Sequence, residues 1–473
     1  MRKIYISLFS LLTLSLFSQL TYPSLNINLL SHLDPESADA GDGRNYSGCW
    51  GWYQASKNKE YALVGSSAKT YFIDVTNPMV PKICDSVYGH SVCTWRELKT
   101  YQNYCYVVSD VCTPNGLQII DMQYLPDSVH VVYDDSLLFE RAHTVWVDGN
   151  KMYVGGNAKR GAGTTGMNVY SLANPTAPIL LRKLGQDFSI PSYVHDMYVI
   201  HDTVYASGGF DKLYVFKFNN GPNNFSLLGS LTTYPESDYN HSSWRTPNGK
   251  TLVFCDERVN LSIKVADVTD LSNISISSLV RPNMDPGFIA HNPYVVSNEW
   301  VYVSCYQDGL LLYDITTPSA PVVKGFFDTY PQGGSGVTTN YGGVCCRGNW
   351  GAYPYLPSGI VIACDMQNGI FILKPSSVIG VKEENKNDLS VNVYPNPVIN
   401  KLNVTFANEN SKTHSIEITN VLGETIYSEN SLSDCGFPIV FKTIDVSDYS
   451  NGTYFLNVRI DDRSHQQKFI IAK

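Results

Sequence analysis

The stretch AHNPYVVSNEWVYVSCYQDGLLLYDITTPSAP, residues 290–321, holds two apolar, strand-like runs, and the second run ends in an aspartate before a proline-rich stop. This pattern recurs along the chain. The position at the end of the second apolar run occurs seven times, at spacings of 46 to 60 residues. The residues there are Asp74, Asp121, Ser171, Lys217, Asp267, Asp314 and Lys374. That spacing is typical of one four-stranded propeller blade. The sequence therefore predicts an all-β fold built on a seven-bladed β-propeller.

The two ends of the repeat array indicate how the ring closes. The last copy ends at Lys374 with no outer strand after it, whereas residues 24–34 precede the first copy and alternate like a strand. We expect residues 24–34 to form the outermost strand of the last blade, because an unpaired edge there would favour aggregation. A solenoid is the alternative, but it needs atypical repeats at both ends, and none is visible.

The first residues and the overall composition indicate an exported protein. Residues 1–18 begin with Arg2 and Lys3 and continue in an apolar run, which predicts a secretory signal peptide. That run is shorter than the roughly 20 residues of a membrane span, so we expect no transmembrane segment. A formal charge of -9 argues against a nucleic-acid partner. The 32 tyrosines and 35 glycines, with only 16% charged residues, favour a β-rich secreted protein.

Export makes the eleven cysteines candidates for disulfides. Cys105 is close to Cys112 in sequence and Cys84 to Cys93, so each pair could link the two sides of a hairpin. Cys345 and Cys346 are adjacent and are expected to pair elsewhere. The odd total leaves at least one free thiol, and the connectivity stays open.

A histidine opens the innermost strand in four consecutive predicted blades. In the other three blades the position is taken by an arginine or a tryptophan. Since innermost strands line the central channel, we expect these side chains to crowd one mouth of it. The set is Trp50, Arg96, His143, His195, His241, His291 and Trp350.

Two interpretations of this ring remain open. Converging imidazoles could hold a divalent metal ion, with His143, His195, His241 and His291 as ligands, or an anionic ligand, and the tryptophans could stack on a sugar or peptide. Alternatively, each histidine bonds the neighbouring blade and fixes the packing. Loops predicted on the same face carry carboxylates that could assist either role, at Asp110, Asp211, Asp256, Glu257, Asp308 and Asp365.

Several segments of the repeat array carry a family resemblance. NKEYALVGSSAKTYFIDVTNPMVP, TWRELKTYQNYCYVVSD, GFFDTYP and NWGAYPYLPSGIVIACDMQNGIFILKP resemble the choice-of-anchor B family and its LVIVD-type repeats, over roughly residues 25–375. The resemblance implies an exported propeller displayed at the cell surface, with no established enzymatic activity. The chain departs from the pattern at Ser171 and Lys217, where the aspartate is missing.

After Pro375 the character of the chain changes. Residues 376–390 are polar and charged, as in a linker, and residues 391–473 alternate like the strands of a small β-sandwich. The latter resemble the type A C-terminal sorting domain of the type IX secretion system; a fibronectin-like carbohydrate-binding module is the alternative. The resemblance rests on Tyr394, Pro395, Asn396, Pro397, Gly423, Gly452, Thr453 and Tyr454. It implies a Bacteroidetes-type bacterium, passage through the outer membrane and removal of the domain by a sortase-like peptidase.

The expected organisation is therefore a signal peptide (1–18), a propeller (24–375), a linker (376–390) and a sorting domain (391–473). We expect a cell-surface protein that binds a glycan, peptide or protein and that meets the type IX secretion machinery during export. The alternative is a metal-assisted hydrolase or lyase that uses the histidine ring. Because no Ser-His-Asp or paired-glutamate signature is readable, we name no catalytic residue and expect a binding protein rather than an enzyme.

Overall fold

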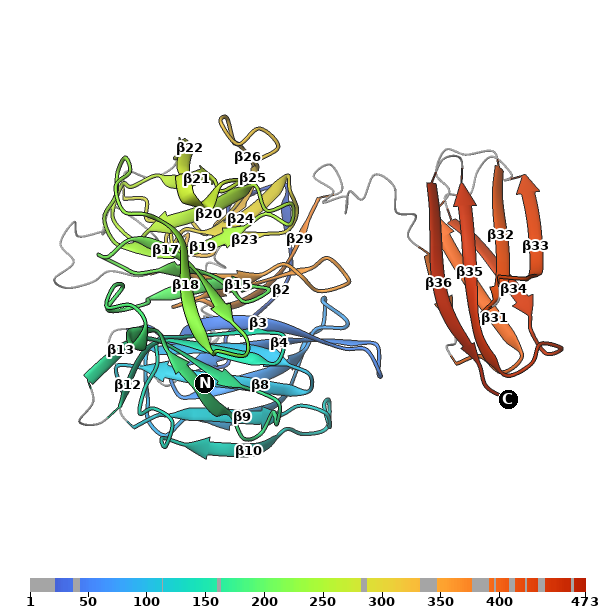
Figure 1. Cartoon of the computed structure of the whole chain (residues 1–473), viewed down its shortest axis with the longest axis horizontal. Coiled ribbons are helices and arrows are strands. Elements are labelled where there is room, and N and C mark those ends of the chain that lie inside the picture. The colour runs from blue at the N-terminus through green and yellow to red at the C-terminus, as the bar shows by residue number, and fades with distance from the viewer. Residues whose placement is uncertain are drawn as a thin grey trace, which may run out of the picture. The chain divides into compact units, whose positions relative to one another are not determined.

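The computed structural model divides the chain into two compact units, Met1–Gly380 and Val381–Lys473, which are described separately (Figure 1). It describes residues 22–36, 43–112, 114–159, 163–281, 287–331, 347–376, 391–394, 397–407, 413–421, 423–432, 439–460 and 463–473. The predicted signal peptide, residues 377–390 of the predicted linker, Cys345, Cys346, Pro395 and Asn396 lie outside these residues. Within the described ranges, every helix is too short or too polar to cross a membrane.

The fold is all-β, and the described part of the first unit forms seven antiparallel sheets, none of which closes into a barrel. The first sheet contains β3 (Tyr46–Gln54), β4 (Lys59–Ser66), β5 (Lys69–Asp74) and β6 (Lys82–Tyr88). The second contains β7 (Trp95–Tyr101), β8 (Tyr104–Asp110), β9 (Leu117–Asp121) and β10 (His130–Asp135). The third contains β11 (Thr144–Asp148), β12 (Lys151–Lys159), β13 (Gly163–Ser171) and β14 (Ile179–Lys183).

The remaining sheets follow the same order from the first strand to the fourth. The fourth contains β15 (Asp196–Ile200), β16 (Thr203–Ser207), β17 (Leu213–Asn219) and β18 (Asn224–Leu231). The fifth contains β19 (Asn240–Arg245), β20 (Thr251–Asp256), β21 (Ile263–Asp267) and β22 (Ser275–Val280). The sixth contains β23 (Asn292–Val295), β24 (Trp300–Ser304), β25 (Leu310–Asp314) and β26 (Val322–Phe327). The seventh contains β27 (Asn349–Tyr353), β28 (Val361–Asp365) and β29 (Gly369–Pro375). Two short 3-10 helices, η1 (Leu184–Gln186) and η2 (Leu271–Asn273), lie in connections.

The first strands of successive sheets lie side by side. β3 contacts β7, β7 contacts β11, and the series continues through β15, β19 and β23 to β27, which contacts β3 again. The last sheet packs on the first through a shared apolar core that includes Val64, Ile73, Ile362 and Ile372. The series of seven sheets therefore returns to its starting point.

The N-terminal segment supplies the missing outer strand of the seventh sheet, as expected from the sequence. β2 (Ile27–Leu33) pairs antiparallel with β29, with Ile27 opposite Pro375 and Leu33 opposite Ile370. One feature was not predicted: β1 (Ser24–Leu25) pairs with β26 as a fifth strand of the sixth sheet. Because Asn26 takes a left-handed conformation (φ 58°) between β1 and β2, the same short segment bridges two sheets.

The repeated aspartate at the end of the third strand forms a turn. The Asp74 carboxylate accepts a hydrogen bond from the backbone N–H two residues further on, at 2.9 Å, and Asp121, Asp267 and Asp314 do the same at 2.8 to 3.0 Å. Ser171 makes the equivalent bond through its hydroxyl, at 3.2 Å. This Asx-type turn explains why aspartate recurs and why serine replaces it.

The second unit contains two sheets that share one apolar core. The first contains β30 (Val391–Tyr394), β31 (Lys401–Ala407) and β34 (Ile439–Asp445). The second contains β33 (Thr425–Leu432), β32 (Thr413–Asn420), β35 (Gly452–Ile460) and β36 (Arg463–Ile471). Buried side chains from both sheets meet in the core, among them Val404, Ile444, Ile416 and Leu456.

Removing residues 24–33 tests how far the first unit depends on its N-terminal strands. The deletion exposes the edge of β29 and takes away Ile27, which is 1% exposed and packs in one cluster with Phe327 and Phe371. We expect a lower midpoint and loss of cooperativity in thermal unfolding followed by circular dichroism, together with aggregation. A chain that lacks residues 391–473 is the matched control and should retain the transition of the first unit. An unchanged midpoint after removal of residues 24–33 would contradict the closure.

Candidate functional site

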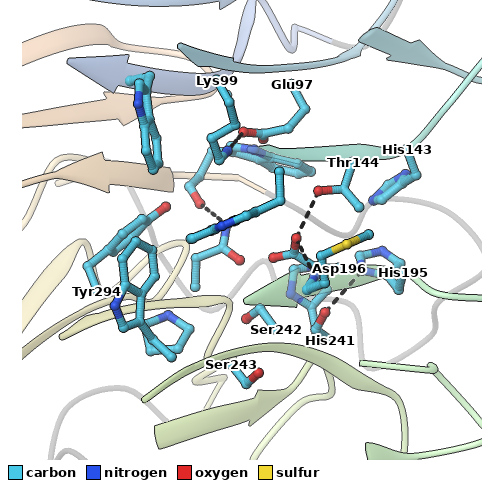
Figure 2. A pocket seen from close by; sticks show the side chains of 18 of the residues that line it. Glu97, Lys99, His143, Thr144, His195, Asp196, His241, Ser242, Ser243 and Tyr294 are labelled. Atoms are coloured by element: carbon cyan, nitrogen blue, oxygen red, sulfur yellow. Dashed lines mark hydrogen bonds and ion pairs between the residues drawn. The ribbon is translucent and has the colours of Figure 1, made fainter. Parts of the chain in front are cut away.

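The first strands of all seven sheets bound one cavity, which we call the central cavity (Figure 2). Its volume of about 50 Å³ is room for a few water molecules or a small ion. The side chains around it form three successive layers. Each layer takes its residues from equivalent positions of the first strands.

The histidine layer consists of His143, His195, His241, His291 and Trp350. The ring centroids of neighbouring histidines are 4.0, 4.2 and 4.2 Å apart, and those of His291 and Trp350 are 4.4 Å apart. These five predicted residues therefore share one level of the structure. His195, His241 and His291 are buried, with exposures of 7%, 3% and 0%.

Each of three histidines uses one ring nitrogen to bond the next sheet. Nδ1 of His195 lies 3.2 Å from the carbonyl oxygen of His241, and Nδ1 of His241 lies 3.0 Å from that of His291. Nδ1 of His291 lies 2.6 Å from the carbonyl oxygen of Trp350. Since a carbonyl only accepts, Nδ1 carries the proton, and Nε2 presents a lone pair in the neutral ring. These bonds give the histidines a packing role, and they leave the chemistry of Nε2 available.

Burial keeps these three rings neutral. It lowers the pKa of His195 and His241 well below the usual value of 6.5, and neighbouring histidines lower both further. Burial also lowers the pKa of His291 to about 3. At neutral pH all three rings are therefore uncharged.

His143 differs from the other three because its partner is a carboxylate. Its Nδ1 lies 2.8 Å from Oδ2 of Asp110, whose Oδ1 accepts from Nη1 of Arg141 at 2.8 Å. Burial alone would lower the pKa of His143, but the hydrogen bond and charge of Asp110 outweigh it and raise that pKa. The raised pKa of His143 and the contact with Asp110 favour the charged, ion-paired form of the two side chains.

Two of the predicted mouth residues also line the central cavity, but their side chains do not join the histidine layer. Arg96 is 2% exposed, and its Nε donates to the carbonyl oxygen of Ser66 at 3.0 Å, so its side chain links the first and second sheets. Trp50 lies three positions beyond the residue of its strand that is equivalent to the histidines. That residue is Ser47, whose Oγ donates to the carbonyl oxygen of Arg96 at 3.1 Å, as the histidines do to their neighbours. The first strand of this sheet begins earlier than the sequence count assumed.

An aromatic layer closes the cavity at the level of Trp50. Its ring centroid is 6.1 Å from that of Trp146, which is 5.1 Å from that of Trp244. Nζ of Lys99 lies 4.3 Å from the Trp50 ring centroid, a cation–π contact. Sequence reasoning missed this layer, although the signal is present: an aromatic residue follows three positions after each histidine, in HTVW, HDMY, HSSW and HNPY.

A polar layer lies between the other two and consists of Glu97, Thr144, Asp196, Ser242 and Asn292. The carboxylate of Glu97 pairs with Lys99, at 2.5 Å from Nζ. Oδ1 of Asp196 accepts from the Thr144 hydroxyl at 2.8 Å. Burial raises the pKa of Asp196 to about 6. The cavity thus holds two carboxyl groups. The charge of Glu97 is balanced by the ammonium of Lys99, whereas Asp196 can exchange a proton near neutral pH.

The predicted loop carboxylates are placed differently from one another. Besides Asp110, Glu257 reaches the histidine layer, with Oε2 3.7 Å from Nε2 of His241. Asp211 accepts from the Ser192 backbone and side chain. Asp256 forms a wholly buried ion pair with Lys264 at 2.9 Å. Asp308 is buried, and Asp365 accepts hydrogen bonds from the backbone N–H groups of Gln367 and Asn368.

The eight cysteines in the described ranges are all free, so the pairings of Cys105 with Cys112 and of Cys84 with Cys93 are not formed. Cys105 is buried in an apolar core, whereas Cys112 lies in a loop. Cys93 lies close to Cys112 instead. Sγ of Cys93 donates to the carbonyl oxygen of Asp110, near Cys112, at 2.6 Å, and Sγ of Cys112 donates to that of Val92, next to Cys93, at 3.4 Å. The sequence spacing of the cysteines did not predict that the loops carrying Cys93 and Cys112 lie close together.

Residues 392–472 match the family described as the secretion system C-terminal sorting domain. The second unit therefore carries a sorting domain, which indicates export to the cell surface by the type IX secretion system. Of the motif residues, Gly423 takes a left-handed turn (φ 81°), and the Tyr454 hydroxyl donates to the carbonyl oxygen of Ser450 at 2.9 Å. Gly452 begins β35, and Pro397 is exposed.

The remaining comparisons are distant. PorZ, described as an essential bacterial surface component of the type IX secretion system of Porphyromonas gingivalis, is 12% identical, with a TM-score of 0.37, over 88% of this chain and 70% of that chain. U3-55K is 9% identical, with a TM-score of 0.48, over 74% of this chain and 98% of that chain. No curated protein matches the sequence. At these TM-scores neither structure informs the function of this chain.

Two variants of His291 separate the contribution of its Nδ1 hydrogen bond to stability from the contribution of the rest of the imidazole ring. His291→Ala removes one of the two donors to the buried carbonyl oxygen of Trp350, which keeps a 3.1 Å bond from Nδ2 of Asn292, so the lost bond costs about 0.5–1.5 kcal/mol. In His291→Asn, the amide nitrogen takes the position of Nδ1, so we expect most of that loss to be recovered. Chemical denaturation of both proteins measures the difference. Equal destabilisation of the two variants would show that the bond contributes little.

Asp365 provides a pH test of burial in the seventh sheet. It is 0% exposed and accepts from the Thr329 hydroxyl at 2.6 Å and from two backbone N–H groups, yet burial raises its pKa to about 7. The folded state therefore binds a proton that the unfolded state, with a pKa of about 3.9, releases earlier. As the pH rises from about 4 to 7, this group lowers the free energy of unfolding, by about 1.4 kcal/mol per unit of pKa difference.

We therefore expect Asp365→Asn to gain stability relative to the parent protein as the pH rises through this window. Denaturation midpoints of the two proteins at matched pH values measure the change. A stability difference that does not vary with pH would contradict the raised pKa.

Proposed function

We propose that residues 24–375 form a seven-bladed β-propeller, displayed at the cell surface, that binds a glycan, peptide or protein ligand at the histidine-side mouth of its central channel. Residues 376–390 then act as the linker to the sorting domain. The succession of seven sheets whose first strands return from β27 to β3 supports the propeller. The LVIVD-type resemblance of the repeats supports the same architecture.

The observation that carries the binding role is the aromatic and cationic lining beside the histidine layer. The rings of Trp95 and Trp350 stack at 4.7 Å, and the guanidinium of Arg44 lies 4.9 Å from the Trp95 ring centroid. Nearby, the guanidinium of Arg258 lies 5.4 Å from the ring of Phe210, which is 67% exposed. Aromatic faces next to guanidinium groups suit sugar rings, peptide groups and anionic substituents.

The central cavity is too small for such a ligand, so the proposed ligand lies across the mouth and not in the channel. The buried histidines separate the mouth from the polar layer, and Lys99 occupies the space over Trp50. The rival role, a metal-assisted hydrolase or lyase, is favoured by one observation, the proximity of Glu257 to the histidines.

Glycan and peptide arrays probed with the mature chain test the binding role. Trp95→Ala removes the outer ring of the stacked pair, and we expect about tenfold weaker binding, which corresponds to about 1.4 kcal/mol. Tyr124→Ala is the matched control, because Tyr124 is also an exposed aromatic residue (47%) and lies beyond β9, away from the cavity. Equal losses in both variants, or no ligand on either array, would contradict a binding site at this mouth.

Removing residues 391–473 tests the route of export. Since the sorting domain is a separate unit, the truncated chain should fold and remain in the periplasm. Protease digestion of intact cells, followed by immunoblotting of fractions, shows where the chain is. Normal amounts of truncated protein at the cell surface would contradict a sorting role for this domain.

A further inference from the structure

Three side chains from two neighbouring sheets bring ligand atoms together at the histidine layer. His195 immediately precedes β15, His241 lies within β19, and Glu257 immediately follows β20. One nitrogen or oxygen atom from each lies within 4.8 Å of the others, and Nε2 of His241 is 3.7 Å from Oε2 of Glu257. The ends of separate strands thus supply two imidazoles and one carboxylate to one point.

The hydrogen bonds around these side chains prepare them as ligands. Each imidazole donates Nδ1–H to a backbone carbonyl oxygen, so the lone pair is on Nε2. The Tyr306 hydroxyl donates to Oε1 of Glu257 at 2.6 Å, while Oε2 is the oxygen close to His241. Outer hydrogen bonds of this kind fix the tautomer and orientation of metal ligands.

The electrostatic surroundings also favour a cation. Glu257 is a carboxylate beside two buried imidazoles, and the nearest positive ring, His143, is paired with Asp110 at 2.8 Å. The Asp110 carboxylate offsets part of the repulsion that the His143 ring would exert on a cation. A cation bound there would also be attracted by the carboxylate of Glu257.

The geometry points to a binding site for one zinc-class divalent ion, held by Nε2 of His195, Nε2 of His241 and the carboxylate of Glu257, with a further coordination position open to water or a ligand oxygen. Two imidazoles and one glutamate with an open position are a ligand set that Zn²⁺ takes in proteins, whereas Mg²⁺ and Ca²⁺ prefer oxygen ligands. Zn²⁺ bonds of about 2.0–2.1 Å place ligand atoms roughly 3.3 Å apart, so side-chain movements of about 1 Å complete the site. The inference is independent of which ligand binds at the mouth.

This ligand set differs from the four histidines that the sequence suggested. His143, which pairs with Asp110 through Nδ1, is not among the three residues whose ligand atoms converge. His291 stacks between His241 and Trp350 and is not among the three residues whose ligand atoms converge. A loop glutamate takes the third place instead.

Metal titration of the mature chain, after treatment with a chelator, tests the site. We expect isothermal titration calorimetry to give one Zn²⁺ per chain with a dissociation constant below about 1 µM, a tightness suited to three preorganised ligands. Co²⁺ in the same site should show the visible absorption of a four- or five-coordinate ion. Failure to bind either ion stoichiometrically overturns the inference.

Matched variants then identify the ligands. His195→Asn and His241→Asn keep a donor at the Nδ1 position and lose Nε2, and Glu257→Gln keeps an acceptor for Tyr306 but loses the charge. We expect each of these three variants to weaken Zn²⁺ binding by about tenfold to a hundredfold or more. His291→Asn makes the same change in a neighbouring ring and should stay within about threefold of the parent protein.

Thermal unfolding of each variant shows whether a loss of metal comes from a loss of fold. Glu257→Gln alters no sheet-to-sheet histidine bond, so it tests the site even if the histidine variants unfold. Zn²⁺ binding that survives Glu257→Gln unchanged, or that falls equally in His291→Asn, overturns the assigned ligand set.

Discussion

The first unit depends on one constraint, the antiparallel pairing of β2 with β29. A row of sheets that pack only on their neighbours has two ends, and each end exposes a strand edge and an apolar face. Here the N-terminal strand completes the seventh sheet, and the seventh sheet packs on the first. The seven first strands are thereby brought around a single cavity, and the three layers of side chains described above exist only because that arrangement closes.

The two interpretations of the histidine ring are compatible, because the two nitrogens of an imidazole have different roles. Nδ1 of His195, His241 and His291 bonds the adjacent sheet, and this bond sets the tautomer that places a lone pair on Nε2. Packing therefore prepares the same rings for a ligand. In the part of the chain that the structure describes, Nε2 of His291 has no hydrogen-bond partner, which shows that the second nitrogen is not needed for packing.

Much of this architecture could be predicted from repetition alone. The strand pairs, the closing segment and the shared level of four histidines and Trp350 follow from spacing, because each copy of a repeat places its residues at the same offset. The exceptions have local causes. Trp50 was assigned to the histidine layer because the position equivalent to the histidines in β3 belongs to Ser47, a residue with no aromatic or ionisable group to mark it. Arg96 occupies the expected position, but its side chain turns to the adjacent sheet. The proximity of Glu257 to His241, or of Cys93 to Cys112, depends on how the loops fold in three dimensions. The spacing of the repeats along the sequence does not predict it.

The central claim is that hydrogen bonding between sheets fixes the protonation of the histidine ring, and imidazole nitrogen NMR tests it most directly. In protein labelled with ¹⁵N-histidine, single-residue asparagine variants assign the signals at neutral pH. The account predicts the neutral Nδ1–H tautomer for His195, His241 and His291, and an imidazolium for His143 in its pair with Asp110. The Nε2–H tautomer, or a charged ring, at His195 and His241 would contradict it.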